Sequence, residues 1–201
     1  MKKVAFIISH MGSGSDYLVD VLNNNPRCAF FTSPTRYEHP DSLQWIFKYH
    51  KLNNYSGAIY GDHLLFNHSF CCKSLYDCCK FIYIIRPARQ SLNEIFTNVK
   101  KGYNKNSMVN YYRYRLRRIC EMAKITKDSV LLTYDELISG KNFGIIEKYL
   151  NLIQPLQNVD VDGELDLSIK ENHFSESVIS QTQDCYEKYF YYLNNLGIKR
   201  P

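Results

Sequence analysis

The hydrophobic pattern of the chain is a repeated unit: a short apolar run, a polar loop, then a segment with helical spacing of apolar residues. Two such runs cover residues 4–8 and 81–85, and a third strand is expected to start at residue 129 and to pass into a loop by residue 137, ahead of a helix over 143–150. Short continuous apolar runs are typical of strands buried on both faces of a parallel sheet. The alternation predicts an α/β fold, a central parallel sheet flanked by helices.

The segment after the first run is rich in glycine and serine. It reads Ser-His-Met-Gly-Ser-Gly-Ser-Asp over residues 9–16, and an apolar-periodic segment follows at 17–22. A buried strand, such a loop and a helix together aim backbone N–H groups and a helix N-terminus at an anion, usually a phosphate. The glycines allow close backbone approach, and the serine hydroxyls add donors. The alternative is a Gly/Ser turn that binds nothing.

This loop differs from the phosphate-binding loop of ordinary kinases and ATPases. With Gly14 as the last glycine, Ser15 stands where that motif has its lysine, and Asp16 where it has the hydroxyl that holds magnesium. The glycine that should open the motif is also missing. The sequence therefore argues against an ordinary magnesium-dependent NTP enzyme.

The second apolar run ends in an arginine. Arg86 follows the run directly, and a helix is expected over 90–96. An arginine at the carboxyl end of a central strand lies where open α/β sheets bind ligands. Its planar guanidinium suits a phosphate, and its burial would be hard to explain without an anion partner.

Taken together, these segments resemble the sulfotransferase family, whose members transfer a sulfuryl group from 3′-phosphoadenosine 5′-phosphosulfate (PAPS). Residues 9–18 stand where the family has its S-x-P-[RK]-[ST]-G-[ST]-T-x-L loop, and residues 82–94 where it has I-x-x-x-R-[DN]-P-[RK]-x-x-x-x-S. Residues 134–137 and 150–152 match its Tyr-Glu-x-Leu-like strand end and its Leu-Gly-Leu-like stop. The resemblance runs in order across residues 4–152 and implies a P-loop-NTPase-like architecture.

In the family, the loop cradles the 5′-phosphosulfate, and the arginine and serine of the second element hold the 3′-phosphate. The resemblance thus implies these cofactor-binding residues: Met11, Gly12, Ser13, Gly14, Ser15, Arg86 and Ser91. It implies PAPS as the donor and a hydroxyl of a carbohydrate, lipid or small molecule as the acceptor. Sulfuryl transfer needs a base for the acceptor proton and donors on the leaving phosphate, but it does not demand a metal, so none is expected.

Three positions depart from the family pattern. Gly12 replaces the basic residue that reaches the sulfuryl oxygens, Asp16 replaces the last threonine of the loop, and Glu94 stands in place of the serine. Ser91 lies one helical turn from that position and is the expected substitute. A carboxylate beside a phosphate is repulsive unless it is protonated or turned away. These departures bear on PAPS turnover more than on the fold.

A further expected strand, over residues 58–65, ends in Gly-Asp-His. It resembles the Gly-Asp-Lys that bacterial sulfotransferases carry between their two phosphate motifs. His63 is therefore the candidate catalytic residue, as a base or as a cationic stabiliser. The alternative is a histidine that caps a strand end or packs in a polar niche. His68 and the pair Glu38 and His39 are further candidates for this role, and for each of them the alternative is an ordinary loop residue.

Composition sets the outer bounds. The chain has 201 residues, of which 45% are hydrophobic and 22% charged, which predicts a single domain over residues 1–201 with a substantial core. No apolar stretch approaches the roughly 20 residues of a membrane span, and the first residues do not match a signal peptide. We therefore expect a cytoplasmic protein.

Seven cysteines are present, four of them as the pairs Cys71-Cys72 and Cys78-Cys79. The pairs suggest a zinc site, but their spacing matches no common one. With Leu75 they fall on one face of a short helix that leads into the strand at residue 81. We expect buried, reduced thiols there.

The helix expected over residues 107–123 carries Arg113, Arg115, Arg117 and Arg118 among tyrosines. Such a helix could face nucleic acid or an anionic substrate. Because these arginines spread around the helix and the net charge is only +5, we expect a solvated face with one or two arginines reaching the cofactor, and no nucleic-acid partner.

The last part of the chain predicts a packing helix near residues 186–193, ended by Asn194 to Gly197, whose aromatic side chains fill the core or form a homodimer surface. The stretch 154–175 is polar and irregular. Lys170 is the candidate there for the basic loop that, in the family, closes over the 3′-phosphate.

Three hypotheses stay open on these grounds. The first is a sulfotransferase that acts on a hydroxyl-bearing acceptor. The second is a non-catalytic relative that binds a nucleotide or an anion on the same fold, and the third is a P-loop-type phosphotransferase with an atypical loop. The sequence determines neither the acceptor nor the oligomeric state.

Overall fold

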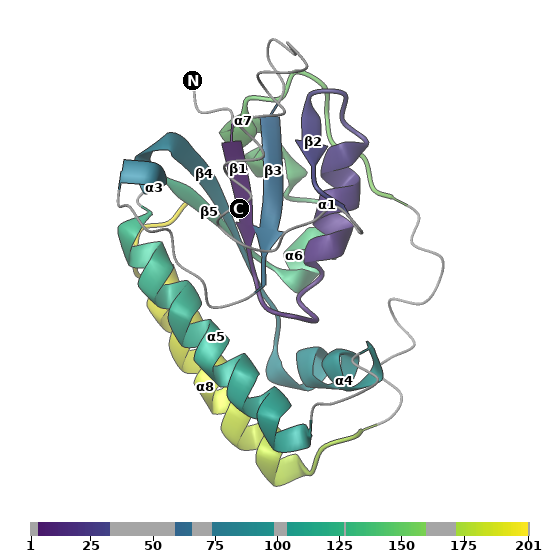
Figure 1. Ribbon diagram of the computed structural model, residues 1–201, viewed down its shortest axis with the longest axis vertical. Helices are drawn as coiled ribbons and strands as arrows, with labels where there is room; N and C mark the ends of the chain where they lie inside the picture. Colours follow the sequence, from purple (N-terminus) through teal and green to yellow (C-terminus); the bar gives the residue numbers. More distant parts are fainter. Residues whose placement is uncertain are drawn as a thin grey trace.

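The computed structural model describes the chain in six segments: residues 4–32, 59–65, 74–98, 104–126, 128–159 and 172–200. Within them, strands and helices are interspersed along the chain (Figure 1). In chain order the elements are β1 (Val4–Ile8), α1 (Ser15–Asn23), β2 (Cys28–Phe30), β3 (Ile59–Leu64), α3 (Ser74–Cys78), β4 (Cys79–Ile85), α4 (Ala88–Asn98), α5 (Lys105–Ile125), β5 (Ser129–Thr133), α6 (Tyr134–Ile138), α7 (Phe143–Leu150) and α8 (Glu176–Asn194).

The sheet has five strands in the order β2-β3-β1-β4-β5, and every pair is parallel. The first strand of the chain is therefore central, with Ile7 opposite His63 on one side and Ile82 on the other. Because all strands run the same way, their carboxyl ends share one edge of the sheet. The predicted α/β fold with a central parallel sheet is confirmed.

The central strand is buried on both faces. Phe6 and Ile8 pack into a core cluster with residues of α4, α5 and α8, whereas Ala5 and Ile7 pack with residues of α1, α6 and α7. Figure 1 shows the long helices α5 and α8 side by side along one side of the sheet, with α1 and α7 on the other. The unbroken apolar runs are thus explained by helices on both faces.

Three elements differ from the expectation: one in its type, one in its length and one in not having been predicted. Residues 134–138 form the short helix α6 instead of a loop, because Thr133 and Glu136 make a capping box in which each side chain bonds the other's backbone N–H. The last helix, α8, already starts at Glu176. The three-residue strand β2 was not predicted, since so short an edge strand leaves almost no periodic pattern.

The cysteine prediction is only partly confirmed. Cys79 is buried but belongs to β4 instead of the preceding helix, and Cys78 is exposed at the end of α3, so the expectation that it is buried was wrong. The reason is that the chain changes from helix to strand between the two residues, which turns their side chains apart. Neither forms a disulfide within the described residues. Cys71 and Cys72 lie outside the described residues.

Candidate functional site

The loop between β1 and α1 passes tightly against two other elements. Gly12 has a φ of 71° and Gly14 a φ of 84°, in the left-handed region that favours glycine. A Cβ atom at Gly12 would lie 2.8 Å from the carbonyl oxygen of Ser91, and one at Gly14 would lie 2.8 Å from the ring of Tyr134. The basic residue that the family carries at position 12 has therefore no room in this loop.

Two hydroxyl groups of the loop region are buried and find no partner in the described segments. The Oγ atoms of Ser9 and Ser13 make no hydrogen bond within the described part of the chain. Helix α1 begins at Ser15, and its N-cap residue is Gly14. Because glycine has no side chain, no side-chain cap accepts the backbone N–H groups of the first turn. Buried polar atoms without a partner are rare in folded proteins and need an explanation. Together with a helix N-terminus, they fit the oxygens of an anion.

Arg86 lies directly against this loop. Its Nη1 donates to the carbonyl oxygen of Gly12 at 3.1 Å and to the carboxylate of Glu94. Its guanidinium carbon is 3.6 Å from the centre of the Tyr134 ring. The arginine is fully buried, and its Nε and Nη2 have no hydrogen-bond partner in the described residues. The two strand ends thus converge, but protein groups cover the arginine.

His63 comes from the neighbouring strand β3. Its side chain is 1% exposed, and its Nδ1 lies 3.5 Å from Oδ1 of Asp16, whose own side chain is 69% exposed. Asp16 stands in the first turn of α1, next to Ser15 of the loop. The histidine therefore lies beside the start of α1, with its Nδ1 facing a carboxylate. The structure brings His63, the loop and Arg86 to the same edge of the sheet.

Two of the residues that the resemblance implies use their polar groups within the protein. The Ser91 hydroxyl donates to the carbonyl oxygens of Arg86 and Pro87, at the start of α4. The backbone N–H of Met11 donates to the hydroxyl of Tyr111 at 3.0 Å. The part that Ser91 and Met11 would play in cofactor binding stays a prediction.

Helix α5 holds the three central strand ends, and the sequence did not predict this. Arg115 is fully buried and donates through Nε to the carbonyl oxygen of Ser9 at 2.7 Å, and through Nη2 to that of Leu64. Tyr112 donates to the carbonyl oxygen of Arg86 at 2.7 Å. One helix thereby connects the ends of β1, β3 and β4.

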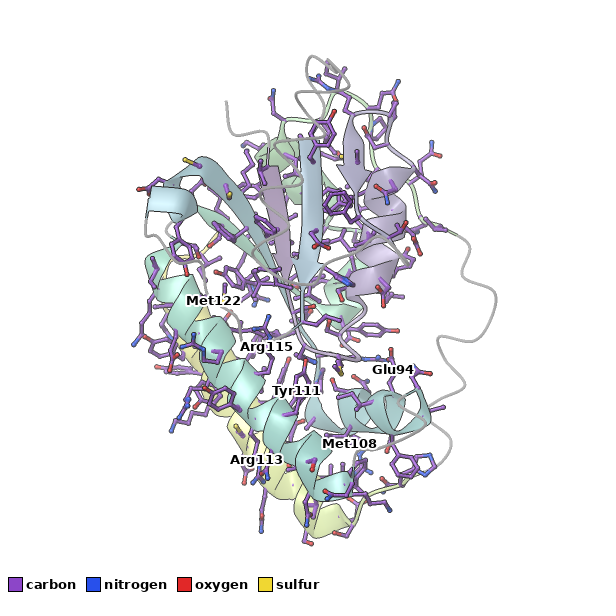
Figure 2. All side chains as sticks on the ribbon, viewed as in Figure 1. Glu94, Met108, Tyr111, Arg113, Arg115 and Met122 are labelled. Carbon is purple, nitrogen blue, oxygen red and sulfur yellow. The ribbon has the colours of Figure 1, made fainter. Side chains whose placement is uncertain are left out.

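Tyr111 adds to this network by donating to the carbonyl oxygen of Leu65 at 2.7 Å. Figure 2 shows Tyr111 and Arg115 on the side of α5 that faces the strand ends. The sequence did contain a signal, since Arg115 stands beside Leu116 on the apolar face of an amphipathic helix. Arg117 and Arg118 instead pair with Glu121 on their own helix.

His10, inside the loop, is neutral because of its surroundings. Burial lowers the pKa of His10 to about 3, and the positive charges of Arg115 and Arg86 act in the same direction. Its Nε2 accepts the backbone N–H of Arg86 at 3.1 Å, and its Nδ1 is 2.9 Å from the carbonyl oxygen of Met11. Burial likewise lowers the pKa of Arg115 to about 10, which leaves it charged at neutral pH.

Within the segments described here, no group of His, Cys, Asp and Glu side chains could hold a metal ion. Nor does any helix in them have the length and apolar character needed to cross a membrane. Several residues considered from sequence lie outside the described segments: Glu38, His39, His68 and Lys170.

The comparison with known proteins supports the fold. No protein-family model and no curated protein matches the sequence. Among solved structures, the chain is similar to mouse sulfotransferase SULT7A1 complexed with PAP, at 12% identity and a TM-score of 0.60, covering 95% of this chain and 85% of that one. Retinol dehydratase, in complex with androsterone and inactive cofactor PAP, aligns at 12% identity and a TM-score of 0.42, over 98% of this chain and 67% of that one.

The chain therefore has the sulfotransferase fold, a P-loop-like α/β architecture. This confirms the fold that the motif resemblance implied.

Proposed function

We propose that this protein is a sulfotransferase, which transfers a sulfuryl group from PAPS to a hydroxyl of a carbohydrate, lipid or small-molecule acceptor. One observation carries the proposal: in a chain with the sulfotransferase fold, the glycine loop, Arg86 and His63 meet at the carboxyl edge of the sheet. Ligands of open α/β sheets bind at that edge. The solved neighbour SULT7A1 was complexed with PAP, the nucleotide that PAPS leaves behind.

The polar atoms of the loop fit the phosphosulfate end of such a nucleotide. The buried hydroxyls of Ser9 and Ser13 and the N-terminus of α1 would hold it, and Nε and Nη2 of Arg86 would be available to a second phosphate. Bound PAPS would supply the sulfuryl group and a good leaving group. The chain itself contributes binding, orientation and a place to move the acceptor proton.

His63 is the residue we assign to that proton. Its Nε2 would accept the proton of the acceptor hydroxyl, while the carboxylate of Asp16 faces Nδ1 and orients the ring. Asp16, a departure from the family pattern, thus gains a role in this arrangement. It is a positioning residue, because it acts through the histidine.

A second function is favoured by a specific observation. Arg86 is paired with Glu94 and covered by Tyr134, so its charge is already balanced within the protein. This would suit a non-catalytic relative that binds a nucleotide or an anion on the same fold. The two functions differ in turnover.

The test combines binding and transfer. Calorimetry with 3′-phosphoadenosine 5′-phosphate should show binding. Arg86→Ala should weaken this binding, because it leaves the Glu94 carboxylate beside the loop without its counter-ion, whereas Arg117→Ala, on the half-exposed side of α5, should leave it unchanged. With labelled PAPS and a panel of phenols, sterols and sugars, the wild type should transfer sulfate. His63→Ala should abolish this transfer while the nucleotide still binds.

Asp16→Asn should lower transfer about tenfold at unchanged nucleotide affinity, whereas Asp20→Asn on the same helix should have no effect. If the nucleotide binds but no acceptor is modified, the binding protein is the better description. If the nucleotide does not bind at all, both functions are contradicted.

A further inference from the structure

The two carboxylates at the site each face one of its basic side chains. Asp16 faces His63, and Glu94 pairs with Arg86. The second pair is the more buried one: Arg86 is fully covered, and the Glu94 side chain is only 24% exposed. A bound phosphate on Arg86 would therefore have to compete with a carboxylate that belongs to the protein.

The backbone of Arg86 is held in place by two hydrogen bonds. Its N–H donates to Nε2 of His10, and its carbonyl oxygen accepts from Tyr112. Its guanidinium lies between the carbonyl oxygen of Gly12, the ring of Tyr134 and the Glu94 carboxylate. With the backbone fixed on both sides, Arg86 cannot leave the pair at low cost. The carboxylate would have to move instead.

Glu94 is also close to the loop. A Cβ atom placed on Gly12 would be 3.4 Å from Cβ of Glu94. The carboxylate thus stands beside the loop that would hold the phosphosulfate, on the flank where Arg86 lies. A phosphate in that place would gain Nε and Nη2 of the arginine, which have no partner in the described residues, but would meet a like charge at short range.

We infer that Glu94 is the internal counter-ion of Arg86 and removes the preference of the site for a 3′-phosphate. The nucleotide class that the site accepts is then adenosine 5′-phosphates and 5′-phosphosulfates, with or without the 3′-phosphate. The inference rests on the proposed function, because it assumes that the loop and Arg86 bind a nucleotide. Glu94 is a specificity-determining residue in this view.

The experiment compares two nucleotides on the full chain by calorimetry at low salt: 3′-phosphoadenosine 5′-phosphate and adenosine 5′-phosphate. The wild type should bind both with affinities within about threefold of each other, since the charge of Arg86 is already balanced. Glu94→Gln keeps the size and removes the charge. It should tighten binding of the bisphosphate about tenfold or more and change that of the monophosphate by less than about threefold.

Glu176→Gln is the matched control, because Glu176 also pairs with an arginine, Arg89, but both of these side chains are exposed. It should leave the ratio of the two affinities unchanged. The wild-type ratio needs no variant, so the inference can be tested even if Glu94→Gln does not fold.

A wild type that binds the bisphosphate about thirtyfold or more tightly than the monophosphate would overturn the inference alone. The inference would also be overturned if Glu94→Gln folds but keeps the wild-type ratio of the affinities for the bisphosphate and the monophosphate. If neither nucleotide binds to the wild type or to Glu94→Gln, the proposed function fails, and this inference fails with it.

Discussion

The two sides of the strand ends differ in how completely their polar groups are paired. On the α5 side, Arg115 and Tyr112 donate to the carbonyl oxygens of the strand ends. On the loop side, the hydroxyls of Ser9 and Ser13 and part of the Arg86 guanidinium are buried with no partner in the part of the chain that the structure describes. Since a buried polar group without a partner costs free energy, the paired side acts as a support and the unpaired side is suited to a ligand.

The largest expected effect breaks the support. Arg115→Ala removes the buried guanidinium that donates to the Ser9 and Leu64 carbonyl oxygens, and it leaves the Leu64 oxygen with only the backbone N–H of Ser9. We expect the free energy of unfolding to fall by about 3 kcal/mol, as measured by urea denaturation. Arg117→Ala, whose guanidinium makes a surface ion pair, should cost at most about 0.5 kcal/mol. Equal losses in the two variants would contradict the supporting role of Arg115.

A second variant tests the loop. Gly14→Ala forces an alanine into the left-handed region and brings its Cβ atom to 2.8 Å from the ring of Tyr134. The expected loss of stability is about 2 kcal/mol. Gly197→Ala is matched to it, because Gly197 has a φ of 70° but nothing within 4 Å of an added Cβ atom, so only the backbone cost of about 1 kcal/mol should appear. If Gly14→Ala cost no more than Gly197→Ala, the tight contact with Tyr134 would be contradicted.

A third experiment measures how the free energy of unfolding depends on pH. It tests His10, the buried histidine of the loop whose Nε2 accepts the backbone N–H of Arg86. Its pKa of about 3 in the folded protein lies below the ordinary value of 6.5, so the unfolded chain binds the proton more readily. This contribution is fully present above pH 6.5 and is lost at about 1.4 kcal/mol per pH unit as the pH falls toward 3, or about 2 kcal/mol by pH 5. His10→Gln should reduce this slope in urea denaturation from pH 7 to 5. A slope that is the same in His10→Gln would contradict the neutral, buried state of the histidine.

Most of the sheet could be predicted from local pattern. The apolar runs at residues 4–8 and 81–85 are strands that end at residues 8 and 85, as predicted. They could be recognised because a strand covered on both faces needs an unbroken apolar run. The helix at residues 134–138 could have been predicted too, since Thr133 and Glu136 have the spacing of a capping box. The single domain and the homodimer stay predictions.

The sequence by itself determined most of the elements, the glycine loop and the arginine that follows β4, because each depends on residues close together in the chain. It placed Asp16 and Glu94 at the site as carboxylates that repel a phosphate. Only the tertiary structure decided that one of them faces His63 and the other Arg86. Those pairings, like the reach of Arg115 to the strand ends, depend on how helices pack on the sheet, and the electrostatic effect of a charge depends on what lies a few ångströms from it.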